Sequence, residues 1–108
     1  MTVSLAQTAK QKMPSSPATS DILGWAYYKL GSPESAITQM KEAVKGAPHI
    51  AAFQYHLGMA YLAAGRSHLA VPCLQQALSS DPGFQDAANA RAALEQASKL
   101  RDLPQSND

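Results

Sequence analysis

The side chains that could carry out chemistry in this sequence are three histidines and one cysteine. His49, His56 and His68 stand seven and twelve residues apart, whereas two histidines that share a metal ion on one helical face are separated by about four residues. We therefore interpret each histidine as an ordinary surface or packing residue. The sequence predicts no metal site.

Cys73 has no basic neighbour that would lower the pKa of its thiol, so we expect it to pack between helices rather than to act as a nucleophile. The sequence also lacks a glycine-rich phosphate loop, a nucleophile elbow and a pair of carboxylates that would form a cleft. It therefore predicts a protein without catalytic activity and without a cofactor.

The composition is that of one globular domain with little net charge. The chain has 108 residues, 45% of them hydrophobic and 16% charged, and its formal net charge is +1. Nucleic acids and anionic membranes select concentrated Lys and Arg side chains, and a helical RNA reader would need a basic track, so no nucleic-acid partner is predicted. No run of about 18 apolar residues predicts direct membrane insertion, and no signal peptide is recognised.

The elements that must position any binding residues are indicated by an internal repeat. Seven residue identities recur 34 positions along the chain, at Leu23/Leu57, Gly24/Gly58, Tyr27/Tyr61, Gly31/Gly65, Ala36/Ala70, Ala43/Ala77 and Pro48/Pro82. A period of this length is typical of a solenoid of paired helices, in which each unit buries its apolar face only against its neighbours.

The repeated stretch resembles the tetratricopeptide repeat, whose pattern runs Trp-x2-Leu-Gly-x2-Tyr, then Ala-x3-Phe, then Pro. The segment Leu-Gly-x2-Tyr occurs at Leu23 and again at Leu57. Two positions of the pattern are substituted, by Ser20 and Gln54 in place of Trp and by Met40 and Leu74 in place of Phe. These substitutions predict a core that is apolar but slightly smaller than the family ideal.

The resemblance implies an all-α fold, a right-handed superhelical solenoid of antiparallel helix pairs within residues 1–100. The expected parts are a leftover helix of a preceding repeat (3–13), two full repeats (17–50 and 51–83), a capping helix (84–100) and a disordered tail (101–108). For residues 3–13 a disordered extension is the alternative, since this segment is only weakly apolar.

Local signals agree with these helix boundaries. Ser16 and Ser32 each offer a capping hydroxyl before a proline at the first helical position, which predicts helix starts. Gly31 and Gly65 stand where the first helix of each repeat must end, a place suited to a left-handed residue.

Small residues inside the predicted helices indicate close packing. Gly24 and Gly58 lie in helix interiors, where glycine costs about 1 kcal/mol relative to alanine, so tight helix contacts are the expected compensation. Ala36 and Ala70 are expected to let the two helices of a repeat approach. Pro72 falls early in a second helix, where we expect a small bend to absorb it.

In the tetratricopeptide family the first helix of each repeat lines a concave groove that holds peptides or partner helices. The resemblance implies a mostly aromatic and aliphatic groove lined by Asp21, Trp25, Tyr28, Lys29, Tyr55, Met59 and Leu62. The family's clamp for a C-terminal carboxylate needs Lys, Arg and Asn on these helices. Asp21, Trp25 and Met59 occupy such places, so this clamp is not expected.

Two functions remain open at this stage. The first is a non-catalytic module that binds a protein or peptide, with Trp25 as the anchor; the alternative for Trp25 is packing against the N-terminal helix or a missing repeat. The second is a structural spacer whose exposed ends stack into a homo-oligomer.

The two repeats also resemble the C-terminal repeats of larger bacterial tetratricopeptide scaffold proteins. This resemblance implies a scaffold on either the cytoplasmic or the periplasmic side and leaves the compartment open.

Overall fold

A computed structural model describes residues 16–103, which form five α-helices and no strand. The helices are α2 (Pro17–Lys29), α3 (Pro33–Gly46), α4 (Ala51–Ala63), α5 (Ser67–Ser80) and α6 (Ala87–Arg101). The expected leftover helix at 3–13 and most of the expected tail lie outside the described residues.

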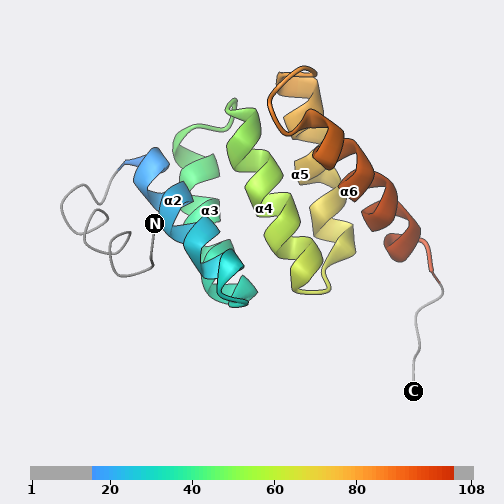
Figure 1. The fold of residues 1–108 in the computed structure, drawn as a ribbon, viewed down its shortest axis with the longest axis horizontal. Helices are drawn as coiled ribbons and strands as arrows, with labels where there is room; N and C mark the ends of the chain where they lie inside the picture. Colours follow the sequence, from blue (N-terminus) through green and yellow to red (C-terminus); the bar gives the residue numbers. More distant parts are fainter. Residues whose placement is uncertain (1–15, 104–108) are drawn as a thin grey trace.

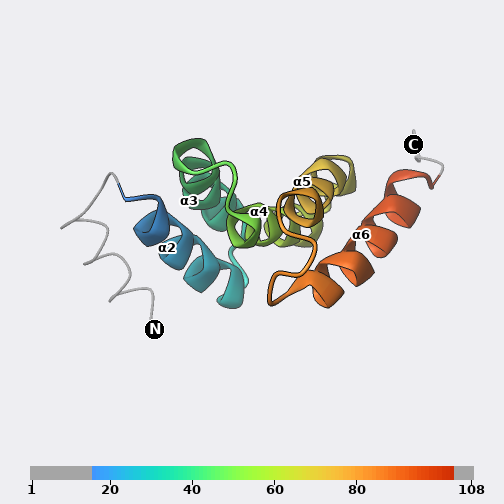
Figure 2. The same ribbon diagram turned by 90° about the horizontal axis from the view of Figure 1, so that it is seen from above.

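The helices stack side by side, and each one packs chiefly against its neighbours in sequence (Figure 1). Figure 2 shows α2, α4 and α6 in one layer and α3 and α5 in the other, with α4 set back between α2 and α6. Such neighbour-only packing is the construction principle of helical repeats. The predicted all-α helical-repeat solenoid is confirmed.

The helix starts follow the proline positions more closely than the capping hydroxyls. The Ser16 hydroxyl accepts a hydrogen bond from the Thr19 backbone N–H at 3.4 Å, as predicted for an N-cap. The Ser32 hydroxyl makes no capping bond, so that part of the prediction is wrong. Helix α3 still begins at Pro33, because the ring of proline holds φ near its helical value.

The turns inside both repeats have the same geometry. Gly31 and Gly65 each have φ of +78°, in the left-handed region that glycine enters without strain. The following residue closes the turn in both cases, since Ser32 N–H donates to Tyr27 O and Arg66 N–H to Tyr61 O, each at 2.9 Å. The predicted left-handed ends of the first helices are confirmed.

The interior glycines are required by close helix packing. A Cβ added at Gly24 would lie 2.6 Å from Cγ of Met40, and one at Gly58 would lie 2.8 Å from Cγ of Leu74. Met40 and Leu74 are both fully buried. The same glycine contact therefore recurs with the 34-residue period, and the predicted compensation for the glycines is confirmed.

The two positions where the family pattern has Trp are buried but polar. The Ser20 hydroxyl donates to Glu42 Oε2 at 3.4 Å, and Gln54 Nε2 donates to the Pro48 carbonyl at 3.1 Å. Buried polar groups cost little when they are hydrogen-bonded, so Ser20 can tie α2 to α3 within the first repeat, and Gln54 can tie α4 to the end of that same repeat. The expectation of an apolar core is wrong at these two places.

Helix α6 covers α5 with small side chains and turns a polar face away. Ala90, Ala93 and Ala97 are buried in the core, whereas Arg91 and Glu95 are exposed. The helix runs from Ala87 to Arg101, so it starts three residues later and ends one residue later than predicted. The difference arises because the turn after Asp81 extends to Asp86 and includes Phe84.

Candidate functional site

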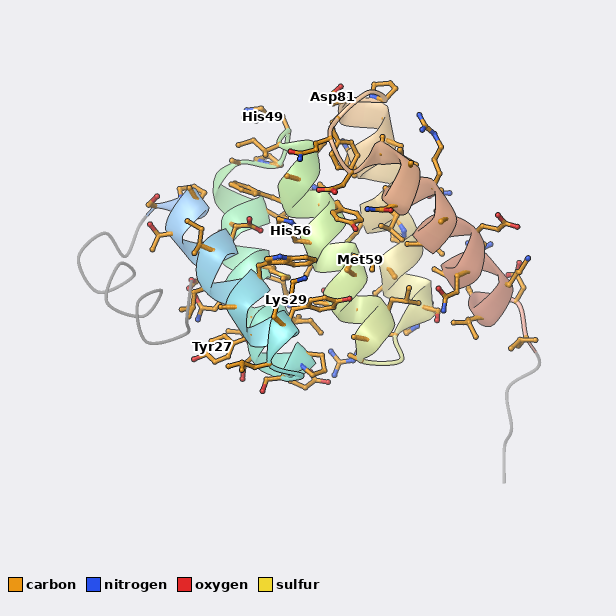
Figure 3. All side chains as sticks on the ribbon, in the orientation of Figure 1. Tyr27, Lys29, His49, His56, Met59 and Asp81 are labelled. Atoms are coloured by element: carbon orange, nitrogen blue, oxygen red, sulfur yellow. The ribbon has the colours of Figure 1, made fainter. Side chains whose placement is uncertain are left out.

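The seven residues predicted to line a groove lie on the layer made by α2, α4 and α6. We call the side of this layer that faces away from α3 and α5 the inner face. Four of them come from α2, at the i, i+4, i+7 and i+8 spacing that shares one helical face, and three from α4: Asp21, Trp25, Tyr28, Lys29, Tyr55, Met59 and Leu62. Figure 3 looks onto this layer and shows Lys29, His56 and Met59 there.

Trp25 is the centre of a cluster of rings that joins α2 to α4. Its ring stacks on Tyr28 with centroids 4.6 Å apart and on His56 with centroids 4.2 Å apart. Tyr55 lies at 6.4 Å in a tilted arrangement. Such offset contacts between rings stabilise beyond the area that they bury. Trp25 therefore packs across the inner face against α4, and it remains partly exposed.

Asp21 and His56 form a nearly buried hydrogen-bonded pair beside this cluster. Nδ1 of His56 lies 2.8 Å from Oδ1 and 2.9 Å from Oδ2 of Asp21. The side chains are only 15% exposed for His56 and 10% for Asp21. Asp21 is thus committed to holding the imidazole and presents no free carboxylate to a partner.

His56 is the residue that sequence reasoning missed. By the 34-residue period His56 is equivalent to Ile22. Each of them directly follows a residue that was predicted to line the groove, Tyr55 and Asp21 respectively. Its contact with Asp21 joins residues 35 apart and depends on how α2 crosses α4. The one available signal was the presence of an acid and an imidazole on successive first helices.

Tyr55 extends the ring cluster toward α6. The Phe84 ring meets it edge-on with centroids 5.8 Å apart. Burial is the main cause that raises the pKa of Tyr55, the negative charge of Asp86 adds to it, and a hydrogen bond with Asn89 opposes it. The Tyr55 hydroxyl is therefore neutral at physiological pH and belongs to a hydrogen-bonded junction between α4 and α6.

A pocket of about 440 Å³ opens at the end of the inner face where α4 and α6 begin. It is lined by His49, Ile50, Ala51, Ala52, Ser80, Asp81, Phe84, Gln85 and Asp86. Figure 3 labels His49 and Asp81 at this end of the molecule. Sequence reasoning assigned Phe84 to the capping helix and did not anticipate the pocket.

The other end of the inner face is more exposed. Lys29 places its ammonium 5.2 Å from the centre of the Trp25 ring, a cation–π contact, and is itself exposed. Met59 and Leu62 are half-buried apolar side chains of α4. The inner face thus combines partly exposed rings and aliphatic groups with few charges, which suits the binding of another protein surface.

A family model for the tetratricopeptide repeat matches residues 23–83 and 57–96 of the chain. The chain belongs to the tetratricopeptide repeat family. Tetratricopeptide repeats generally serve as protein–protein interaction modules and are typically non-catalytic. A search of curated proteins found no match to the chain.

Outside the inner face, Cys73 of α5 is a free cysteine. Burial raises the pKa of the Cys73 thiol to about 11, which keeps the thiol protonated at neutral pH. Within residues 16–103 no three His, Cys, Asp or Glu side chains come together as metal ligands. In the same region every helix is too short or too polar to cross a bilayer.

Proposed function

We propose that the inner face binds a peptide or a helix of a partner protein and that the chain acts as a non-catalytic interaction module. The observation that supports this most is the cluster of partly exposed rings around Trp25, which is joined through the buried ring of Tyr55 to partly exposed Phe84. Aromatic anchors of this kind dominate binding energy at protein interfaces. The seven predicted residues, together with His56, form the proposed binding surface.

The proposal treats residues 17–50 and 51–83 as the two repeats of one domain, with α6 as the capping helix. The α6 residues that are equivalent to Leu57, Gly58 and Tyr61 of α4 by the 34-residue period are Arg91, Ala92 and Glu95. The α4 residues pack against α5, whereas the α6 residues are exposed. A polar outer face of this kind is what a terminal helix needs, because no further helix has to pack there.

The affinity we expect is modest. Two repeats offer less area than a standard interface of about 800 Å² per partner, so an isolated peptide should bind with micromolar affinity, roughly 8 kcal/mol or less.

A selection with random peptides tests the proposal. Twelve-residue peptides recovered from a display library on the immobilised protein are measured against two matched variants. Leu62→Glu places a charge on the inner face, and Leu69→Glu places the same charge on exposed α5 in the other layer. We expect Leu62→Glu to weaken binding at least tenfold and Leu69→Glu to leave it unchanged, with both proteins folded by circular dichroism.

The opposite ranking, in which Leu69→Glu abolishes binding and Leu62→Glu does not, would overturn the proposal. Equal loss in both variants would also count against it, since the inner face would then have no special role.

Self-association is a second candidate, favoured by exposed apolar residues on the first and last described helices. Ile22 of α2 is 41% exposed, Leu30 at the C-cap of α2 is 67% exposed, and Leu100 of α6 is 43% exposed. Solvent-exposed apolar ends are the surfaces through which repeat stacks join. Sedimentation velocity over a wide concentration range tests this: a strictly monomeric protein contradicts stacking.

A further inference from the structure

The His56 ring has one nitrogen that the fold uses and one that it leaves available. Nδ1 contacts both oxygens of Asp21, and Nε2 makes no hydrogen bond to any residue in the described chain. We propose that Nε2 of His56 is a fixed hydrogen-bond acceptor on the inner face that selects partner peptides presenting an N–H or O–H donor beside an apolar side chain. This inference rests on the proposed function and names the chemistry of the partner.

The Asp21 carboxylate decides which nitrogen carries the proton. An ionised carboxylate can only accept hydrogen bonds, and distances of 2.8 and 2.9 Å to Nδ1 therefore require the proton on Nδ1. A neutral imidazole has a single N–H, so the lone pair is on Nε2. In the neutral imidazole, the hydrogen bond to Asp21 thus leaves Nε2 as the acceptor.

Nε2 remains open to solvent although most of the ring is covered. The His56 side chain is 15% exposed, and within residues 16–103 the one side-chain polar atom that is sealed from solvent without a partner is Oε1 of Gln39. Nε2 is therefore not sealed from solvent. The proposal requires that a partner lying on the inner face reach this nitrogen.

The ring is held in place before any partner arrives. It stacks on Trp25 at 4.2 Å and is tilted against Tyr55 at 5.6 Å, while Asp21 fixes its rotation. A preorganised acceptor loses little side-chain entropy on binding. It also penalises a mismatched partner, because a group without a donor would cover the lone pair and leave it unsatisfied.

The residues around His56 determine which group can lie beside the hydrogen-bond donor of a partner peptide. Met59 lies one helical turn from His56 on α4 and supplies an apolar neighbour, and the Trp25 and Tyr55 rings form the walls. A cation, Lys29, lies beside Trp25, and an acid, Asp86, lies near Tyr55. A backbone N–H or a hydroxyl next to an apolar side chain matches this arrangement.

The first test reads the proton position directly. Nitrogen-15 correlation spectra of the imidazole rings, recorded on the free protein at a pH where they are neutral, should show His56 with its proton on Nδ1. Exposed His68 is the internal control and should average between the two forms. A His56 signal with the proton on Nε2 would overturn the inference.

The second test uses the peptides recovered from the random library. Each backbone N–H of a bound peptide is methylated in turn, and affinities are compared between the native protein and the double variant Asp21→Leu, His56→Phe. This variant keeps a ring against Trp25 and removes both members of the Asp21–His56 pair, so neither is left buried without its hydrogen-bond partner.

We expect one N-methyl position, or one serine or threonine changed to alanine, to weaken binding to the native protein about three- to tenfold and to have no further effect in the double variant. Equal losses in both proteins at every position would overturn the inference. If instead the peptides are insensitive to Leu62→Glu, the proposed function fails, whereas the imidazole spectra still report on His56 independently.

Discussion

The two repeats share one packing frame. Gly24 meets Met40 in residues 17–50 in the same way that Gly58 meets Leu74 in residues 51–83. The positions equivalent by the 34-residue period are also equally buried, with Ala36, Ala70, Ala43 and Ala77 all at 0% exposure. Close helix contacts admit few side chains, so these positions carry the same or similar residues in both repeats.

On the inner face the two repeats differ at every equivalent position. The pairs are Asp21/Tyr55, Trp25/Met59, Tyr28/Leu62 and Lys29/Ala63. Packing between helices fixes most of these residues only loosely, because all but Asp21 and Tyr55 are at least partly exposed. The shared frame therefore builds the stack, whereas the inner face is left free to differ between the two repeats.

The largest effects are expected from Leu74→Ala and Met40→Ala. Both side chains are fully buried at equivalent places, so each truncation should lower the free energy of unfolding by about 2–5 kcal/mol. Chemical denaturation measures both. A loss below about 1 kcal/mol for one of them would show that the two repeats are not packed equivalently.

Overpacking the equivalent alanines should have the next largest effect. Ala70→Leu and Ala36→Leu each insert a larger side chain at a position with 0% exposure, so each should destabilise by roughly 1–3 kcal/mol. Exposed Ala92→Leu in α6 is the control and should change little. Unchanged melting temperatures for the two buried variants would contradict the packing scheme.

The glycine turns should contribute less and equally. Gly31→Ala and Gly65→Ala introduce a side chain at φ of +78° with nothing within 4 Å of the new Cβ, so only backbone strain acts, at about 1–2 kcal/mol each. Gly83 has equally open space without a left-handed φ, and Gly83→Ala should be nearly neutral. Thermal unfolding of the three variants checks this, and a neutral Gly31→Ala would refute the strain.

The smallest effect on the free energy of unfolding at neutral pH is expected from the ionisation of Cys73. This residue is equivalent to Gln39 of the first repeat by the 34-residue period. Burial raises the pKa of its thiol from 9.0 to about 11. Between these pH values the folded protein keeps a proton that the unfolded chain has lost, so the free energy of unfolding should fall as pH rises. Below pH 9 the contribution is complete.

Burial also raises the pKa values of Tyr55 and Tyr61, which act in the same direction at higher pH. The difference between the native protein and Cys73→Ala therefore isolates the thiol. Denaturation at pH 8, 9, 10 and 11 should give a shallower decline for Cys73→Ala, and parallel declines would contradict the assigned burial.

The repeated frame could be predicted because its causes are local or periodic. Gly31 and Gly65 follow from turn geometry, and Gly24 and Gly58 follow from the period itself. Proline at the first helical position fixed the start of α3 even though Ser32 makes no capping bond. Each of these features depends on a few residues that are close in sequence or exactly in phase.

The contacts between repeats could not be predicted in the same way. The Asp21–His56 pair depends on the angle at which α2 crosses α4, and the period assigns these residues to different positions. Phe84 could continue a helix by its pattern, yet it lies in a turn where its ring contacts Tyr55. The Gln54 side chain of the second repeat likewise bonds to the Pro48 carbonyl of the first repeat.

The most direct test of the binding surface is to map a bound peptide by NMR. The indole N–H of Trp25 is a unique reporter, because the chain contains one Trp. On titration with a library-selected peptide we predict that this signal and the backbone amides of α2, α4 and α6 shift, while those of α3 and α5 stay in place. Shifts confined to α3 and α5, with the Trp25 indole unmoved, would contradict the account.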